Sequence, residues 1–287
     1  MAYQKQVLTI AGFDPSGGAG IAADMKTFSA HGVFGLSVAT AIAIQNTQTL
    51  TRVFDLPVSI IEEQIDLLFS DFDIAAVKTG MLFSQQIVES VVSRLIQQGA
   101  KNIVVDPVMV SKSGAALLAP DAVLSLKENL LPICHLVTPN CLEAERMMGR
   151  KVETLTDAKF AAEAIFGFGP KAVLIKGGHL LTDSGTDLLF DGTDFTIIPG
   201  EYIATRHTHG TGCTYASAIA ARLALGDALM DAVFSAKRYM TEAIRNALEV
   251  GHGIGPVDPL WNLPPFGKEG SHPSRGQRAL RGVHPSP

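Results

Sequence analysis

The stretch QVLTIAGFDPSGGAG, residues 6–20, is an apolar run followed directly by a glycine-rich segment. A short apolar run bounded by a glycine predicts a buried strand over Gln6–Ala11. After the glycines, Ile21, Met25 and Phe28 stand at helical spacing. Strand, glycine loop and helix follow in the order typical of nucleotide-binding α/β folds, but the spacing is not the Rossmann G-x-G-x-x-G pattern. The glycines alone fit a tight turn without a ligand equally well.

The same alternation continues along the chain. Further strands are predicted from apolar runs at 36–44, 53–56, 74–77, 102–105, 135–137 and 172–175. Helices are predicted from Ser59, whose spacing to Glu62 matches a capping box, and over 84–98, 156–166, 213–225 and 229–250. Asp191-Gly192 between two short apolar runs predicts a hairpin over 187–198. Strands that are apolar on both faces and alternate with helices predict an α/β fold, with a central, mostly parallel sheet flanked by helices on both faces.

Composition limits the class of function. Apolar residues make up 47% of the 287 residues, charged residues 18%, and the net charge is −5, which does not favour nucleic-acid binding. No apolar run approaches the ~20 residues of a membrane span, and no signal-peptide pattern is present. Three cysteines in a chain of this length favour a reduced, cytoplasmic protein. We expect one domain over residues 1–263 and a disordered tail over 264–287, which is rich in Pro, Gly, Ser and Arg.

Polar clusters follow the predicted strands. They lie at 12–20, 45–48, 78–81, 106–109, 138–143 and 176–178. In open parallel sheets, the carboxyl ends of the strands form the edge where ligands bind. Six clusters at one edge therefore predict a ligand site. The amide and hydroxyl side chains of 45–48 suit recognition of a heterocycle, although a polar loop explains them as well.

A second glycine turn, HTHGTGCT at 207–214, precedes a run of small residues. Gly210, Thr211 and Gly212 can deliver backbone N–H groups at a helix start, an arrangement that binds phosphate. We expect the helix dipole to lower the pKa of Cys213 by about one unit from ~8.5, so that some thiolate exists at neutral pH. The alternative is that Cys213 only fills space beside a tight turn. His209 is expected beside the site.

These features together suit phosphoryl transfer, which depends on positioning and charge neutralisation. Asp106, Glu143 and Asn140 offer oxygen ligands for Mg²⁺. Lys176 can neutralise phosphate oxygens, and Cys213 can take the proton of an attacking hydroxyl. Cys134 and Cys141 are interpreted as core residues.

Seven blocks of sequence resemble one known family in their order. They are residues 9–32 (TIAGFDPSGGAGIAADMKTFSAHG), 43–47 (AIQNT), 78–82 (KTGML), 106–114 (DPVMVSKSG), 138–145 (TPNCLEAE), 175–179 (IKGGH) and 209–214 (HGTGCT). The segment GIGPVDPLW at 253–261 extends the match. The chain resembles the hydroxymethylpyrimidine/phosphomethylpyrimidine kinases, the thiamine-biosynthesis branch of the ribokinase-like superfamily. Only the tail after Leu263 has no counterpart.

The resemblance implies a ribokinase-like fold, a cytoplasmic homodimer and two ATP-dependent phosphorylations of 4-amino-5-hydroxymethyl-2-methylpyrimidine. It implies that Gln45 hydrogen-bonds the pyrimidine and that four further residues line the same pocket: Gly12, Asp24, Met81 and Val108. It implies that Cys213 is the base, that the Gly-Thr-Gly-Cys turn forms the anion hole, and that Lys176, Asp106 and Glu143 serve ATP and Mg²⁺. Two alternatives are a pyridoxal kinase of the same superfamily and a non-catalytic pyrimidine-binding module.

Overall fold

The computed structural model describes residues 5–109, 118–178, 180 and 185–263. Within these residues, nine strands form one sheet in the order β3-β2-β1-β4-β5-β6-β7-β8-β9. The neighbouring pairs from β2 to β7 are parallel, whereas β3, β8 and β9 join antiparallel. The strands are β1 (Gln6–Phe13), β2 (Phe34–Gln45), β3 (Leu50–Asp55), β4 (Ile74–Thr79), β5 (Ile103–Val105), β6 (Leu136–Val137), β7 (Val173–Ile175), β8 (Asp187–Phe190) and β9 (Phe195–Ile198). The predicted mostly parallel sheet and the hairpin are confirmed.

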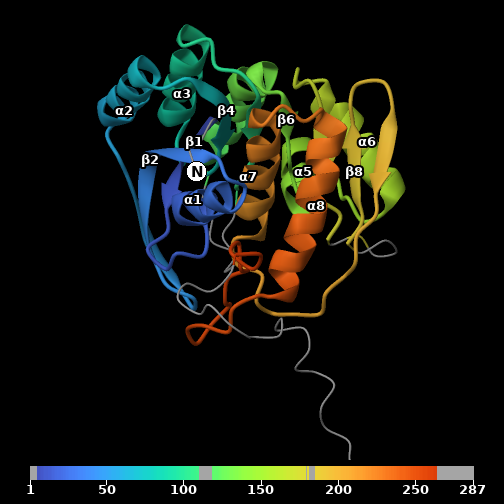
Figure 1. Cartoon of the computed structure of the whole chain (residues 1–287). Helices are drawn as coiled ribbons and strands as arrows, with labels where there is room; N and C mark the ends of the chain where they lie inside the picture. Colours follow the sequence, from blue (N-terminus) through green and yellow to red (C-terminus); the bar gives the residue numbers. More distant parts are fainter. Residues whose placement is uncertain (1–4, 110–117, 179, 181–184, 264–287) are drawn as a thin grey trace, which may run out of the picture.

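Helices cover both faces of this sheet, as predicted. On the near face in Figure 1 lie α1 (Gly20–Ala30), α7 (Thr211–Ala224) and α8 (Leu229–Arg245). The other face carries α2 (Val58–Asp71), α3 (Gln85–Gln97), α4 (Pro120–Ser125), α5 (Cys141–Met148) and α6 (Leu155–Phe166). Alternate residues of one strand enter different cores: Val104 packs with α7 and α8, whereas Ile103 and Val105 pack with the helices of the other face. This explains why the strands are apolar at successive positions.

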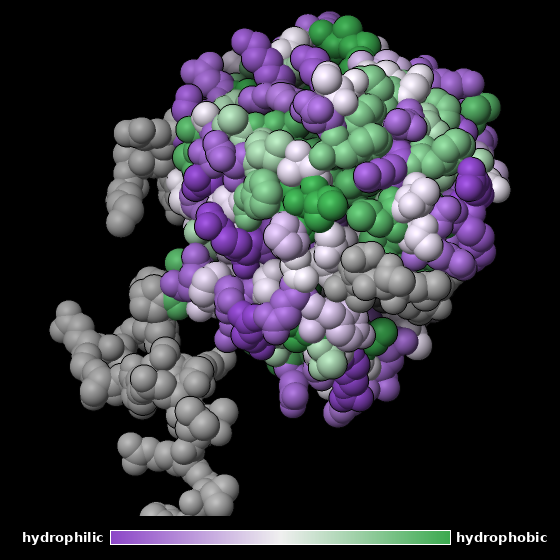
Figure 2. Space-filling model, turned by 90° about the vertical axis from the view of Figure 1, so that its right-hand side faces the viewer, coloured by the Kyte–Doolittle hydropathy of each residue, from purple (hydrophilic) through white to green (hydrophobic). Residues whose placement is uncertain are grey.

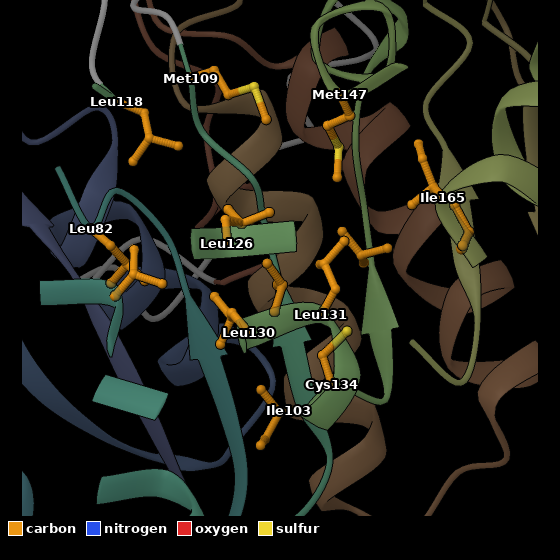
Figure 3. Packing of buried hydrophobic residues seen from close by; sticks show 14 of the residues in the cluster. Leu82, Ile103, Met109, Leu118, Leu126, Leu130, Leu131, Cys134, Met147 and Ile165 are labelled. Carbon is orange, nitrogen blue, oxygen red and sulfur yellow. The ribbon is translucent and has the colours of Figure 1, made fainter. Parts of the chain in front are cut away.

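The larger core draws side chains from distant parts of the chain. Figure 3 shows Ile103 of β5, Leu126 and Leu130 of the turns after α4, Met147 of α5 and Ile165 of α6 in one cluster. Leu130 and Ile165 are fully buried. Burial of one such side chain contributes about 1.5–3 kcal/mol to folding, and the cluster thereby holds the helices of this face on the sheet.

Three local predictions are corrected. The helix predicted to start at Ser59 begins at Val58, with Pro57 as its N-cap and no side-chain cap. Gly12 and Lys78, which the sequence places in loops, lie inside β1 and β4. The strand β4 is longer than its apolar run because a buried partner, described below, satisfies the polar side chain of Lys78.

The surface at the right of Figure 1, which carries α6 and the β8–β9 hairpin, is turned to the viewer in Figure 2. Apolar side chains gather near the middle of this face, within a hydrophilic rim. Phe160 of α6 and Ile197 of β9 are among the exposed large apolar residues. None of the described helices is long and apolar enough to cross a membrane. The predicted tail over 264–287 lies outside the described residues, as do His179 and residues 110–114.

Candidate active site

One cavity of about 820 Å³ lies at the carboxyl ends of the strands. The sheet order arranges its lining: Gln45 ends β2, Asp106 follows β5, and Lys176 follows β7. Neighbouring strands lie about 4.8 Å apart, so Gln45 and Lys176 belong to opposite sides of the cavity. The predicted residues that line it are Gly12, Gln45, Met81, Asp106, Val108, Asn140, Glu143, Lys176, Gly210, Thr211, Gly212 and Cys213. The structure thus brings together every predicted site residue except Asp24.

Asp24 is fully buried outside the cavity lining. Its carboxylate accepts hydrogen bonds from Thr9 Oγ1 at 2.6 Å, Ser217 Oγ at 2.7 Å and Lys78 Nζ at 2.9 Å. Burial alone would lower the pKa of Lys78, but Asp24 outweighs it and holds the pKa above its ordinary value. Thr9, Lys78 and Ser217 belong to β1, β4 and α7, so this buried ion pair ties α1 to three other elements.

The cavity is narrow at Gly12. A Cβ atom there would lie 2.3 Å from Met81 Cε, so any side chain at Gly12 would displace Met81. Gln45 is half-buried at the end of β2, and Met81 and Val108 pack together beside Ala41. An amide at the rim of an apolar slot suits a flat ring with polar edges.

Two glycine loops interlock beside this slot. Gly210, the N-cap of α7, has φ 79°, and a Cβ there would lie 1.8 Å from the carbonyl oxygen of Gly18. His209 Nε2 lies 2.8 Å from Asp14 Oδ2, and its ring packs on Gly18. The backbone of His209 bonds to Gly255 and Val257. Only glycine at 210 permits this approach, and the first glycine loop therefore helps to position the second.

The start of α7 presents unpaired donors. Within the described chain, the N–H groups of Gly212 and Cys213 have no hydrogen-bond acceptor. A Cβ at Gly212 would lie 3.3 Å from Asp106 Oδ2 and 3.4 Å from Lys176 Nζ. The free N–H groups and the Lys176 ammonium therefore converge beside Asp106, where a phosphoryl group can bind.

The expected thiolate at Cys213 is wrong for this structure. Cys213 keeps part of its surface open to the cavity, but desolvation by the surrounding protein raises the pKa of its thiol to about 12. The charge of Lys78 opposes this rise, whereas Asp24 and Asp106 add to it. The helix dipole considered in the sequence is worth about 0.3–1 kcal/mol and does not offset such desolvation.

Lys176 links the two predicted acidic ligands. Its Nζ lies 2.8 Å from Asp106 Oδ1 and 3.8 Å from Glu143 Oε2. Burial opposes the charge of Lys176, but Asp106 and Glu143 outweigh it and hold its pKa above the ordinary value. Asn140 caps α5: its side chain accepts from Glu143 N at 2.9 Å, and Glu143 Oε2 accepts from Asn140 N at 2.8 Å. Across the described residues, no group of three or more His, Cys, Asp or Glu side chains is placed to hold a metal ion.

Sequence reasoning missed several residues of the cavity. Asp187 of β8 accepts from Lys237 Nζ at 2.7 Å and from Tyr215 Oη at 3.0 Å, and all three line the end beyond Lys176. Asp14 was treated only as part of a loop. The segment 253–257 pairs with both His209 and Thr47. These residues lie far apart in sequence without a spacing motif, although 253–257 falls in a block that resembles the family.

Comparison with known proteins agrees with this geometry. A family model described as phosphomethylpyrimidine kinase matches residues 14–258. The hydroxymethylpyrimidine/phosphomethylpyrimidine kinase of Rhizobium meliloti is 51% identical over 254 residues, which cover 87% of this chain and 95% of that protein. The thiamine biosynthesis bifunctional protein ThiED of Geobacter sulfurreducens is 46% identical over 252 residues, or 88% of this chain. The chain spans about half of that protein's length, 51%.

Solved structures show the same architecture. A phosphomethylpyrimidine kinase from Clostridium difficile superposes with a TM-score of 0.75 and 45% identity, over 84% of this chain and all of that chain. A pyridoxal kinase from Staphylococcus aureus in complex with AMP-PCP and pyridoxal gives a TM-score of 0.83 and 36% identity, over 91% of this chain and 96% of that one. The fold is therefore shared by both kinds of kinase. Because the family model spans most of the chain and relatives at 43–51% identity carry the matching name, the chain belongs to the phosphomethylpyrimidine kinase family.

Proposed function

We propose that this protein transfers a phosphoryl group from ATP to the hydroxymethyl oxygen of 4-amino-5-hydroxymethyl-2-methylpyrimidine. A second transfer to the monophosphate gives the diphosphate used in thiamine biosynthesis. The observation that carries this proposal is the single cavity that joins the slot at Gln45 to the donors at Gly212 and Lys176. Membership of the family supplies the substrate class.

Each part of the cavity has a role in this proposal. Gln45 binds the edge of the pyrimidine, while Gly12, Met81 and Val108 enclose the ring. Lys176 and the free N–H groups of α7 neutralise the charge of the transferred group, which is the main requirement of phosphoryl transfer. The end lined by Asp187 and Lys237 holds the rest of ATP. Asp24 acts from beneath the cavity as the partner of Lys78, not as a ligand of the ring.

Mg²⁺ fits the residues at the centre of the cavity. Both Asp106 and Glu143 point at Lys176 Nζ, so their carboxylates converge on one place. One or two carboxylates with phosphate oxygens and waters satisfy this ion, which explains why a cluster of three acidic residues is not required. When bound with ATP, Mg²⁺ would neutralise phosphate charge. Asn140 contributes as the cap that holds Glu143 in place, which is a more limited role than the predicted ligand.

Cys213 is proposed to act at the acceptor hydroxyl, but in the substrate-free protein it is a thiol. In a loose transition state the attacking oxygen forms little bond to phosphorus, and loss of its proton comes late. A strong base is therefore not needed at the start. A thiol cannot take up this proton, so Cys213 accepts it only after its own proton has passed to solvent, a loss that the charge of Lys78 and the donors of α7 favour once the substrates are bound.

A pyridoxal kinase is the second candidate, because the solved pyridoxal kinase gives the higher TM-score. The higher sequence identity to the phosphomethylpyrimidine kinases favours the pyrimidine, since pocket side chains and not fold decide substrate choice. A non-catalytic pyrimidine-binding module is disfavoured, because the turn, Lys176 and the acidic pair all line one cavity.

The experiment is product analysis with purified protein, ATP, Mg²⁺ and the free pyrimidine. We expect the monophosphate first and the diphosphate later, separated by anion-exchange chromatography. Pyridoxal in a parallel reaction is expected to give a lower kcat/KM. Faster turnover of pyridoxal would overturn the assignment in favour of the second candidate, and no product from either compound would favour the binding module.

We also propose a homodimer, one kinase domain over residues 1–263 and a cytoplasmic location. The domain proposal is supported by one continuous sheet and by the family match over 14–258. All three cysteines are free thiols, which suits a reducing compartment. The acidic net charge of −5 does not favour a nucleic-acid partner.

A further inference from the structure

The side-chain carboxylate of Asp14 has four hydrogen-bonding contacts, to Ser16, Ala19 and His209. Its Oδ1 accepts from the N–H of Ser16 at 2.8 Å and from Ser16 Oγ at 2.7 Å. Its Oδ2 accepts from Ala19 N at 2.9 Å and lies 2.8 Å from His209 Nε2. The carboxylate is buried, yet it lines the substrate cavity. A fixed carboxylate at this place presents acceptors only.

Gln45 is the neighbour that such an acceptor can control. Asp14 directly follows β1 and Gln45 ends β2, and these strands are parallel neighbours, so both residues lie at the same edge of the sheet. Both line the cavity. Burial opposes ionisation of Asp14, but donation from His209, Ser16 and the Gln45 side chain outweighs it and holds the pKa of Asp14 well below its usual range.

The chemistry of an amide makes this contact directional. Only the nitrogen end of Gln45 can donate to a carboxylate, so its oxygen and its second N–H are left for a ligand. This donor and acceptor pair matches a ring that carries an amino group next to an unprotonated ring nitrogen. The same pairing lets glutamine read adenine in nucleic acids. A 4-oxo ring presents the opposite order and requires the amide to turn over, with its oxygen against Asp14.

We infer that Asp14 is a positioning residue that fixes the amide orientation of Gln45 and thereby selects 4-aminopyrimidines over 4-oxopyrimidines. His209 contacts the same carboxylate and directly precedes Gly210, so it connects Asp14 to the glycine turn at the start of α7. The inference rests on the proposed function and names the part of the ring that the site reads.

The test compares kcat/KM for the 4-amino substrate with that for its 4-oxo analogue, in wild type and in Asp14→Asn. An asparagine can turn either end toward Gln45, so both amide orientations become accessible. We expect the amino-to-oxo ratio to fall by about tenfold or more, the scale of one bidentate pair. An unchanged ratio in Asp14→Asn would overturn the inference, even if all rates were lower.

Two further variants separate an effect of Asp14 on the amide orientation of Gln45 from a general disturbance of the cavity. Ser16→Ala removes one hydrogen bond from the same carboxylate but leaves the acceptor, and should keep the wild-type ratio. In Gln45→Met the ratio should already be low, and adding Asp14→Asn should not lower it further. A second fall in the double variant would show that Asp14 acts without Gln45. Wild-type protein that phosphorylates neither pyrimidine would instead refute the proposed function.

A measurement on wild-type protein covers the case in which Asp14→Asn does not fold. The Gln45 side-chain amide can be assigned in ¹⁵N spectra by its loss in Gln45→Met. We expect one of its two protons to exchange slowly with solvent before any substrate is added. Two protons that exchange at the rate of an exposed glutamine would contradict a fixed orientation.

Discussion

Cys213 occupies the third position of α7, beside the free N–H groups and above the buried Lys78–Asp24 pair. At the scale of the single residue, its state is decided by competition between desolvation, which raises the pKa of the thiol, and the charge of Lys78, which lowers it. Desolvation prevails, and the thiol stays protonated at neutral pH. The proposed proton transfer therefore depends on charges that arrive with the substrates.

This state predicts slow alkylation of Cys213 in the substrate-free protein. With a pKa of about 12, the thiolate fraction at pH 7 is about 3,000-fold lower than for an ordinary thiol of pKa ~8.5. The rate with iodoacetamide should rise about tenfold per pH unit between pH 7 and 10. Mass spectrometry of the peptide follows the reaction, and Cys213→Ser identifies it. A rate that levels off below pH 9 would mean that the thiolate is already available.

The sequence indicates which residues meet at the site but not how deeply each is buried. The position of Cys213 near a helix start could be predicted from the glycines, because turn chemistry is local. Besides burial, the charges that act on its thiol come from Asp24 of α1, Lys78 of β4 and Asp106 after β5. Asp24 illustrates the same limit. The family resemblance implies a ligand contact for Asp24, and only the fold shows that Thr9, Lys78 and Ser217 use its oxygens.

At the scale of the element, α5 shows how a helix start positions a functional carboxylate. Asn140 and Glu143 form a capping box, so the same hydrogen bonds that start the helix direct Glu143 toward Lys176. Asn140 is placed by β6 before it and is aligned with Lys176 by a backbone bridge. The hydrogen bonds that cap α5 therefore also orient a carboxylate of the charged centre.

Asn140→Ala should lower both stability and activity. Loss of the cap costs about 1 kcal/mol in the free energy of unfolding, and the freed Glu143 should raise the KM for MgATP. Thr154→Ala removes the equivalent capping box of α6, far from the cavity, and should cost similar stability without raising this KM. Urea denaturation and initial rates measure the two effects. Asn140→Asp keeps a good cap and should restore stability; equal KM values for Asn140→Ala and Thr154→Ala would exclude the positioning role.

Helices with strong local signals could be predicted well, and those stabilised by packing less well. Ser84 caps α3 and Gly99 ends it with a positive φ, both as the sequence indicates. The helix α2 lacks such a signal, and the apparent capping box at Ser59 is not used, because packing of Ile61 and Ile65 on the sheet sets its start. The order of the strands required the whole fold, since β1 lies between β2 and β4.

At the scale of the whole molecule, the strand order separates the sites proposed for the two substrates. Strands β2, β1 and β4 carry the slot for the ring, whereas β6, β7 and β8 carry the charged residues proposed to bind ATP. The turn before α7 lies between them on the near face, beside both Gly18 and Lys176. ATP and the pyrimidine are proposed to bind at opposite halves of one edge of the sheet. The turn before α7 lies between these halves, so this one turn can contact both substrates.

The outer strands also suggest where two copies meet. Ile42 and Phe54 are cross-strand partners on the β2–β3 ribbon, and both are exposed, at 37% and 55%. Phe13 pairs with Ile42 on the other side and is exposed as well. The patch lies on β1, β2 and β3, with the exposed Arg52 opposite Ile44 at its edge, and a two-fold axis can place it against itself, which is the commonest geometry of homodimers. We place the proposed dimer interface here.

Phe54→Asp should therefore yield a monomer, because a buried unpaired carboxylate at the centre of an apolar interface costs more than the contact it replaces. Phe160→Asp, on the apolar face around α6, should leave the dimer intact. Light scattering after size-exclusion chromatography gives the mass of each variant. Dissociation by Phe160→Asp alone would move the interface to the β8–β9 side. Because Phe13 also lines the substrate cavity, loss of the dimer should raise the KM for the pyrimidine more than that for ATP.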